Sequence, residues 1–438
     1  MKYEFGKQIV PAVYDDHGTR NPLIEALPDS LDMSEFNAAI QNLPPIPMEQ
    51  DVGTVTARRR GMATLHSIFI PISYMYRIYD QLFRLMQAGY YTETSRKMAQ
   101  RINSIFATGH SGYGELPEYA AFLGTAGIGK TTMIKRCLRL MPQVIAHEKY
   151  YGNPFYTKQV LWLFVECPSD ASSKTMALNI VRALDSAVGS HHVDQFMKVR
   201  ASATSSLISY VKTLCITYHV GLLVVDEIQN VVVTAAKKKT LKPLVKLLTE
   251  LTNETCASMF FVGTHLAEEV FIQEEHLRRR TRGFRLTPFT AGGEYRSFLQ
   301  TLWRYQYMPV QTELTERIAN RIYDLSGGIP AYIMKLFEET QANALVQGID
   351  RIDERLITET AALLSIEPPK VYDKGESISD SKAGTRNIEW GEELPTNMPK
   401  RGRKAKRRDK ADLICAFKEE GAETMMLQYG MLEEVVKC

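Results

Sequence analysis

One short segment of the sequence combines the residue types that bind a nucleoside triphosphate. Residues 124–131 read Gly-Thr-Ala-Gly-Ile-Gly-Lys-Thr, a complete G-x-x-x-x-G-K-T pattern. Its glycines let backbone N–H groups curve around a β-phosphate, Lys130 reaches the β- and γ-phosphates, and the Thr131 hydroxyl can ligate Mg²⁺. The predicted nucleotide-binding residues are Gly124, Thr125, Ala126, Gly127, Ile128, Gly129, Lys130, Thr131 and Thr132.

The residues around this loop match the context that the chemistry needs. An apolar, strand-like run, Tyr119 to Leu123, comes before it. A helical pattern follows, with apolar side chains on one face at Met133, Ile134, Cys137, Leu138 and Met141. The alternative, a glycine-rich turn that binds nothing, does not account for these flanks.

A pair of carboxylates at the end of a second apolar run supplies the rest of a hydrolytic site. Leu222-Leu-Val-Val-Asp-Glu227 is a buried-strand pattern that ends in Asp226 and Glu227. Two carboxylates there are costly to bury without a cation, so we expect Asp226 to hold Mg²⁺. Glu227 is then the general base that polarises the attacking water. The loop and the pair together predict an ATPase with ATP and Mg²⁺ as cofactors.

Two further segments carry candidate catalytic residues. The apolar run 258–263 ends in a polar tip, where Thr264, with His265 in reserve, can orient the water or contact the γ-phosphate. An ordinary strand-end turn is the alternative. In the arginine-rich segment 277–284, Arg280 or Arg282 is expected to stabilise transition-state charge in a neighbouring protomer. The alternatives are arginines that bind DNA phosphates or acidic partners, or that are only solvated.

Strand patterns alternate with helical patterns around these motifs. The strand candidates are 119–123, 159–166, 220–226, 258–263 and 284–288. Near-continuous apolar strands separated by helices predict an α/β fold, with a parallel five-stranded sheet flanked by helices. The predicted segments are an N-terminal extension (1–60), an αβα ATPase core (61–290), a small helical lid (291–366), a flexible linker (367–399) and a basic tail with a short docking segment (400–438).

Composition restricts the class of protein further. Of the net charge of +3, residues 400–410 contribute +7, so the remainder sums to −4 and any nucleic-acid surface on the folded body must be local. No apolar run approaches the roughly 20 residues that span a bilayer, and the N-terminus lacks a secretory pattern. The six cysteines form no CxxC pair. We therefore expect a cytoplasmic protein with reduced thiols and no membrane contact.

The order of these motifs resembles that of the AAA+ ATPases, a class of P-loop NTPase, over roughly residues 60–366. Within that superfamily several pieces resemble the transposition-regulating ATPases of the TnsC/TniB family. These are Asp226-Glu-Ile-Gln-Asn230, Val262-Gly-Thr-His-Leu-Ala267, the arginines before Phe284, Leu325-Ser-Gly-Gly-Ile-Pro330, and the upstream segments 67–73 and 89–91.

This resemblance implies an ATP-dependent homo-oligomer, a ring or a helical filament, around duplex DNA. Such proteins link a target-selection protein of the TniQ/TnsD type to transposase subunits, and some serve CRISPR-guided transposons. ATP between protomers drives assembly, and its hydrolysis drives disassembly. One departure concerns the lid, where Pro330 precedes Ala331 in place of the usual sensor arginine and Lys335 is the nearest cation. Slow hydrolysis, suited to a switch, is the expectation.

Two segments are candidates for DNA contact. The resemblance points to the helix start after the second strand, where Lys174, Thr175 and Arg182 can grip phosphates with little sequence readout. A capped helix with a solvated lysine is the alternative. In the tail, Arg401-Gly-Arg403 resembles an AT-hook, whose arginines lie in an A·T minor groove. A generic basic tail or a transposase-docking segment is the alternative.

Two other functions fit the same ATPase pattern. One is a replication-initiator or helicase-loader ATPase, against which the lack of a winged-helix pattern after the lid weighs. The other is a regulatory NTPase that switches protein partners without DNA, against which the basic tail weighs.

Overall fold

The most apolar segments of the chain form five strands of one sheet. They are β2 (Tyr119–Gly124), β5 (Trp162–Glu166), β6 (Leu222–Asp226), β7 (Ser258–Gly263) and β8 (Thr281–Leu286). They lie in the order β5-β6-β7-β2-β8, and every neighbouring pair is parallel. The predicted parallel five-stranded α/β sheet is confirmed. A short strand, β9 (Arg386–Ile388), adds antiparallel to β8 from the segment predicted to be a linker.

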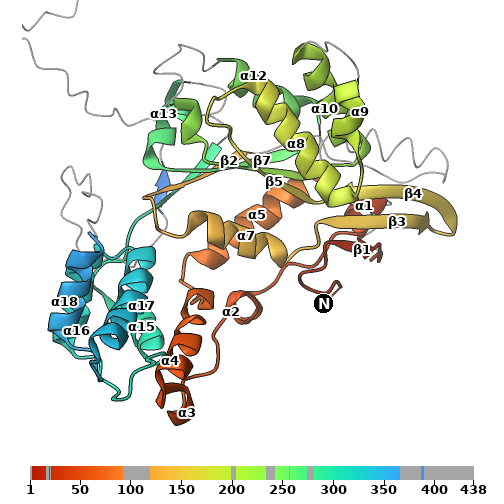
Figure 1. Ribbon diagram of the computed structural model, residues 1–438. Coiled ribbons are helices and arrows are strands. Elements are labelled where there is room, and N and C mark those ends of the chain that lie inside the picture. Colours follow the sequence, from red (N-terminus) through yellow and green to blue (C-terminus); the bar gives the residue numbers. More distant parts are fainter. Residues whose placement is uncertain are drawn as a thin grey trace, which may run out of the picture. The chain divides into compact units, whose positions relative to one another are not determined.

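The computed structural model describes residues 2–15, 19, 21–91, 119–198, 204–232, 242–255, 257–273, 281–365 and 386–388 (Figure 1). The chain divides into two units, Met1–Gly391 and Glu392–Cys438, and all of these residues belong to the first. None of the described helices is both long and apolar enough to cross a membrane.

Helices cover both faces of the sheet because successive strand residues point in opposite directions. Phe122, Val224 and Phe260 belong to one core, together with residues of α5 and α7. Leu123 and Val225 belong to a second core, together with residues of α8, α10 and α12. Figure 1 shows these three helices on one side of the sheet and α5 and α7 on the other. The covering helices are α5 (Met75–Tyr90), α7 (Lys130–Arg139), α8 (Ser173–Val188), α10 (Thr204–Thr217) and α12 (Lys242–Glu254).

Short elements surround this core and a helical group follows it. The N-terminal elements are β1 (Ile9–Pro11), α1 (Pro22–Glu25), α2 (Met33–Ile40), α3 (Glu49–Val52), α4 (Val55–Met62) and η1 (Leu65–Ser67). Shorter core elements are α9 (His192–Lys198), η2 (His265–Ala267) and α13 (Glu268–Gln273). The helices of the predicted lid are α15 (Gly293–Trp303), α16 (Glu316–Ser326), α17 (Pro330–Gln347) and α18 (Glu354–Leu363).

The strand predicted over 159–166 is in fact two strands. A single residue, Leu161, separates β4 (Asn153–Val160) from β5. β4 pairs antiparallel with β3 (Val144–Tyr150). β1 adds to β3 in parallel, so the N-terminal segment forms part of a second, three-stranded sheet in the order β1-β3-β4. The segment predicted as an extension is therefore paired to the body through its backbone.

A buried polar cluster holds the N-terminal segment against this small sheet. His147 is 3% exposed, and its ring lies between Tyr14 Oη at 2.7 Å and Gln159 Oε1 at 2.9 Å. Since Gln159 Nε2 donates to Leu23 O, its oxygen must accept from His147, which makes the ring the neutral Nε2–H tautomer. Burial lowers the pKa of His147 to about 4, against the hydrogen bond to Gln159, which raises it.

This cluster predicts an acid-sensitive fold. The pKa of His219 is also lowered to about 4 by burial and by His147. A histidine whose folded pKa lies below its unfolded value stabilises the protein above about pH 6.5 and loses that contribution as the pH falls toward 4. We expect the unfolding free energy to drop by roughly 2 kcal/mol per histidine between pH 7 and pH 5. Urea unfolding at both pH values measures this drop.

The matched variants separate the two rings. His147→Gln and His219→Gln should each remove about half of the drop, and the double variant most of it. An undiminished drop in the double variant would assign the acid sensitivity to other groups.

Candidate nucleotide site

The loop between β2 and α7 has the geometry of a phosphate cradle. Gly127 has a φ of +81°, a left-handed conformation that favours glycine. Ile128 is buried and anchors the loop in the core beneath it. Lys130 is the first residue of α7, and its Nζ donates to the carbonyls of Gly124 at 2.9 Å and Thr125 at 3.0 Å. The loop therefore curls around its own lysine.

The surroundings of Lys130 favour the binding of an anion beside its ammonium group. Lys130 is 9% exposed, and burial lowers the pKa of its ammonium, while Glu227 and Asp226 act in the opposite direction. A buried ammonium favours a nearby negative charge strongly, because little water screens the attraction. The phosphates of a nucleotide would supply that charge at the position where the loop backbone bends.

The fold joins the loop to the Asp-Glu pair, although 95 residues of sequence separate them. Thr131 Oγ1 donates to Asp226 Oδ2 at 2.7 Å, and the N–H of Glu227 donates to Asp226 Oδ1 at 2.9 Å. Asp226 is 2% exposed. A hydroxyl and a buried carboxylate are hard oxygen ligands, and Mg²⁺ takes one or two of these and fills its other positions with phosphate and water. The predicted Mg²⁺ ligands thus fit the ion.

Glu227 differs from Asp226 in its surroundings. Its side chain is exposed, and its backbone adopts a left-handed φ of +56°, which is uncommon for a residue with a side chain. The side chain accepts a hydrogen bond from Gln229 Nε2. Glu227 is thus a solvent-exposed carboxylate that interacts electrostatically with Lys130, and its role as the general base stays a prediction.

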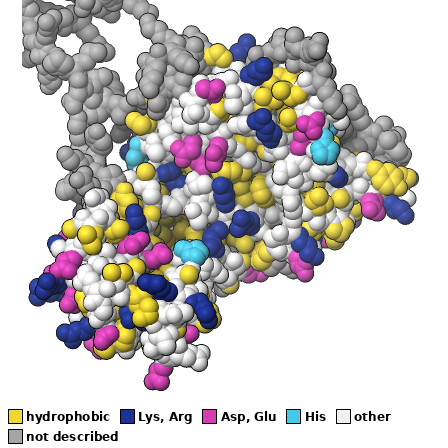
Figure 2. Space-filling view, in the orientation of Figure 1, with side chains coloured by type: hydrophobic (Ala, Val, Ile, Leu, Met, Phe, Trp, Pro, Cys, Tyr) yellow, Lys and Arg dark blue, Asp and Glu magenta, His cyan; other side chains and the backbone are white. Residues whose placement is uncertain are grey.

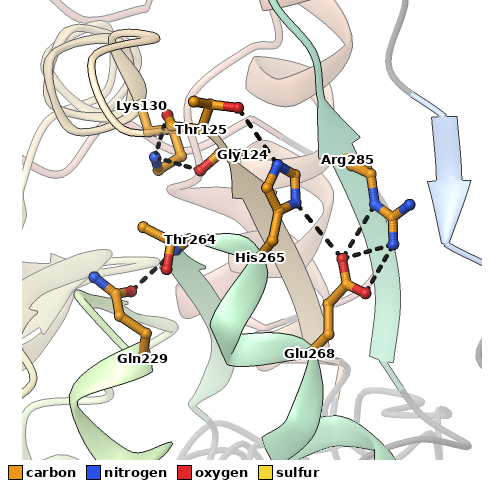
Figure 3. A network of polar contacts seen from close by, with 8 residues as sticks. All are labelled: Gly124, Thr125, Lys130, Gln229, Thr264, His265, Glu268 and Arg285. Atoms are coloured by element: carbon orange, nitrogen blue, oxygen red, sulfur yellow. Dashed lines mark hydrogen bonds and ion pairs between the residues drawn. The ribbon is translucent and has the colours of Figure 1, made fainter. Parts of the chain in front are cut away.

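Thr264 lies at the carboxyl end of β7, next to β2, and its hydroxyl oxygen is buried without a hydrogen-bond partner among the described residues. Such an orphan calls for a ligand or water. The reserve candidate, His265, has its Nε2 3.5 Å from Thr125 Oγ1 of the loop (Figure 3). Both candidates at this tip therefore lie at the site.

Nothing in the sequence signals the ion pair between Glu268 and Arg285, in which Glu268 also contacts His265. Glu268 Oε1 lies 3.6 Å from His265 Nδ1, and both Glu268 oxygens accept from Arg285 Nη2 at 2.7 Å (Figure 3). Burial would raise the pKa of Glu268, but the bonds from His265 and Arg285 bring it below its usual value. Glu268 and Arg285 lie 17 residues apart with no shared motif, so only the fold pairs them.

The candidate arginines are placed unequally. Arg282 is in β8, where it is in register with Ala120, and its side chain is not among the described ones. Arg280 lies outside the described residues. Their assignment to a neighbouring protomer's site stays a prediction.

The lid meets the loop at the position of the expected sensor arginine. The N–H of Ala331, in the first turn of α17, donates to Gly127 O at 3.2 Å. A Cβ on Gly127 would lie 3.3 Å from Ile329 Cγ2 and 3.6 Å from Ala331 Cβ, so a larger residue would press on the lid. Lys335 is exposed, one turn further along. The contact between lid and loop thus runs through the main chain.

The candidate DNA contacts of the described residues lie on α8, with Lys174 and Thr175 at its start and Arg182 in its second half. Lys174 is exposed, while Ser172 caps the helix by accepting from Thr175 N at 3.3 Å. The Thr175 hydroxyl donates to Asp170 at 3.3 Å, and exposed Arg182 donates to Asn179. Both charge signs are distributed over the face shown in Figure 2. Arg401 and Arg403 lie outside the described residues.

The chain was compared with known protein families and structures. The family model described as an AAA domain matches residues 118–271. Among solved structures, the chain is similar to the Drosophila ORC bound to DNA, with 11% identity, coverage of 76% of this chain and 73% of that chain, and a TM-score of 0.43. It is also similar to the Aeropyrum pernix ORC2 protein in its ADP form, with 12% identity, 73% and 70% coverage, and a TM-score of 0.35. No curated protein matches the sequence.

The loop, the strand order and the family match define the class: the chain has the AAA+ P-loop fold, and residues 118–271 match the model of an AAA domain. This fold implies nucleotide binding at the loop between β2 and α7.

Proposed function

We propose that this chain is an ATP-hydrolysing regulator of DNA transposition that assembles as a homo-oligomer on duplex DNA. The observation that carries hydrolysis is the contact of Thr131 with buried Asp226 at 2.7 Å, directly before exposed Glu227. A loop that only held a nucleotide would not need a general base beside its metal ligands.

Three of the segments that carry the TnsC/TniB resemblance have residues at this site, which supports the finer proposal. Gln229, from the first, bonds to Glu227. His265, from the second, lies beside the loop, and Ile329, from the third, faces Gly127. These segments lie far apart in the sequence, so their meeting at one site is what a shared mechanism would require.

The reaction at this site follows from the residues. Thr131 and Asp226 would hold Mg²⁺, which would neutralise phosphate charge when bound. Lys130 binds the phosphates as a buried cation, and the loop N–H groups orient them. Glu227 accepts a proton from the attacking water at its carboxylate, and the Thr264 hydroxyl orients that water or the γ-phosphate.

The remaining roles concern assembly. Arg280 or Arg282 of a neighbouring protomer would complete the site in trans, so that ATP binding favours a ring or filament. Lys174, Thr175 and Arg182, with Arg401 and Arg403 of the tail, would grip DNA phosphates or the minor groove. The assembly would link a target-selection protein of the TniQ/TnsD type to transposase subunits. Direct main-chain contact at Ala331 in place of a sensor arginine suits slow hydrolysis.

Electron microscopy of the full chain with duplex DNA tests this proposal. With a non-hydrolysable ATP analogue we expect rings or filaments on the DNA, because nucleotide joins neighbouring protomers. Omitting nucleotide, or using Lys130→Ala, should leave the DNA bare. A protein that stays monomeric in the presence of both ATP and DNA would refute the proposal. Assemblies that recruit a replicative helicase but never stimulate a transposase would support the replication-initiator or helicase-loader alternative.

A further inference from the structure

The side chain of Gln229 lies between the candidate base and the tip of β7. Its Nε2 donates to Glu227. Its Oε1 accepts from the backbone N–H of Thr264 at 3.0 Å (Figure 3). The carboxylate can only accept and the N–H can only donate, so the amide has one possible orientation. Gln229 is 9% exposed, and both of its hydrogen bonds are partly buried.

The neighbouring backbone leaves room for this amide and little more. A Cβ built on Gly263 would lie 2.6 Å from Gln229 Oε1 and 2.9 Å from Ile228 Cγ2. Since real Cβ atoms do not approach so closely, the side chain reaches Thr264 only because residue 263 is glycine. An asparagine, one methylene shorter, would not span from Glu227 to the strand tip.

The other side of the same strand tip contacts the phosphate loop. The Thr264 hydroxyl is the buried orphan described above, and the next residue, His265, lies 3.5 Å from Thr125 Oγ1. The tip of β7 is thus linked to the loop through His265 and to Glu227 through Gln229. A displacement of the tip, by a phosphate at Thr264 for example, would therefore move the Glu227 carboxylate through the hydrogen bonds of Gln229.

Glu227 needs such a restraint. Its side chain is exposed, so few packing contacts limit its rotamers. Among the described residues, Lys130 of α7 interacts electrostatically with Glu227, and the backbone N–H of Glu227 donates to the adjacent Asp226. Neither of these fixes the carboxylate relative to β7, whereas the amide of Gln229 does.

We propose that Gln229 is a positioning residue for the hydrolytic reaction, which holds the Glu227 carboxylate in place relative to Thr264. The inference rests on the proposed ATPase function and extends it, because it makes the base respond to what the tip of β7 contacts.

Steady-state turnover and binding of a fluorescent ATP analogue by full-length variants test this role. Gln229→Ala should lower kcat by about 10- to 100-fold, a part of what a general base contributes. KM and the Kd of the analogue should stay within about threefold, because no nucleotide-binding group is removed. Gln159→Ala is the matched control, since Gln159 is also a buried amide bonded at both ends but lies in the small sheet. Its kcat should not change.

Gln229→Glu adds a readout that a merely structural role would not move. The substitution keeps the shape of the side chain but places a second carboxylate beside that of Glu227. Repulsion between the two carboxylates raises the apparent pKa of the pair. The acid limb of the pH profile of kcat should therefore shift upward by about one pH unit. In the nucleotide-free protein, the same repulsion predicts that its stability relative to wild type improves as the pH falls from 7 to 5.

The possible results are distinct. If wild type turns over ATP but Gln229→Ala keeps kcat within twofold, or the acid limb of Gln229→Glu does not move, the positioning role is wrong and the ATPase proposal stands. If wild type itself does not hydrolyse ATP, the proposed function fails. Should Gln229→Ala fail to fold, the isosteric Gln229→Glu variant still decides through its pH profile.

Discussion

Replacing Glu227 with Gln is expected to lower ATP turnover by about 10²- to 10⁴-fold, the range that a general base contributes. The amide keeps the size of the side chain but cannot take a proton from water. The metal ligands Thr131 and Asp226 and the lysine Lys130 remain, so ATP should bind as before. Phosphate release and nucleotide affinity, measured on the same preparation, separate the two effects.

The same variant should also change the lifetime of assemblies. If hydrolysis drives disassembly, Glu227→Gln complexes on DNA should form normally and then persist with ATP. Glu148→Gln, an exposed carboxylate on β3, is the matched control and should behave as wild type. Unchanged turnover in Glu227→Gln would exclude this residue as the base.

The second large effect is expected from Lys130→Ala, which should weaken ATP binding by about 100-fold or more, as loss of a charge-assisted contact worth roughly 3 kcal/mol requires. Lys130 is buried and already bonded to two carbonyls of the loop, so its removal also frees the loop from its own restraint. Equilibrium binding of a fluorescent ATP analogue measures the loss.

A lysine on the same helix controls for the charge itself. Lys135 is exposed on α7 and lies over the Phe164 ring at 4.7 Å. Lys135→Ala should retain wild-type affinity, because its ammonium is not at the loop. Equal losses in the two variants would indicate a general charge effect in place of a phosphate contact.

The sheet and the loop could be predicted because their signals are local and strong. The strands β2, β6 and β7 are buried along their whole length, so they read as continuous apolar runs. Thr131 and Asp226 were both predicted to bind Mg²⁺, and the structure places their side-chain oxygens 2.7 Å apart. Because the chemistry at that edge restricts the residue types that can stand there, the site residues can be recognised in a single sequence.

The small sheet was missed for a physical reason. Its hairpin turns at Tyr151 and Gly152, both with positive φ, which is the conformation of a tight two-residue loop. Tyrosine is not a residue that signals such a turn, and β4 is exposed over much of its length. The apolar residues on either side of Leu161 therefore read as one strand, although β4 and β5 belong to different sheets.

Long-range polar contacts were equally hidden. Glu268 and Arg285 carry no motif, and their pairing depends on α13 and β8 lying side by side. Gln229 stood inside a motif used for the resemblance, but its bond to Thr264 depends on the adjacency of β6 and β7. Such contacts arise from tertiary structure and leave no periodic signal.

The central claim is that nucleotide at the phosphate loop controls binding to DNA. Fluorescence anisotropy of a labelled duplex, titrated with the full chain under ATP analogue, ADP or no nucleotide, tests it most directly. We expect the analogue to tighten binding at least about tenfold relative to ADP, a coupling of about 1.4 kcal/mol. Lys130→Ala should abolish the difference. Equal affinities in all three conditions for the wild-type chain would contradict the claim.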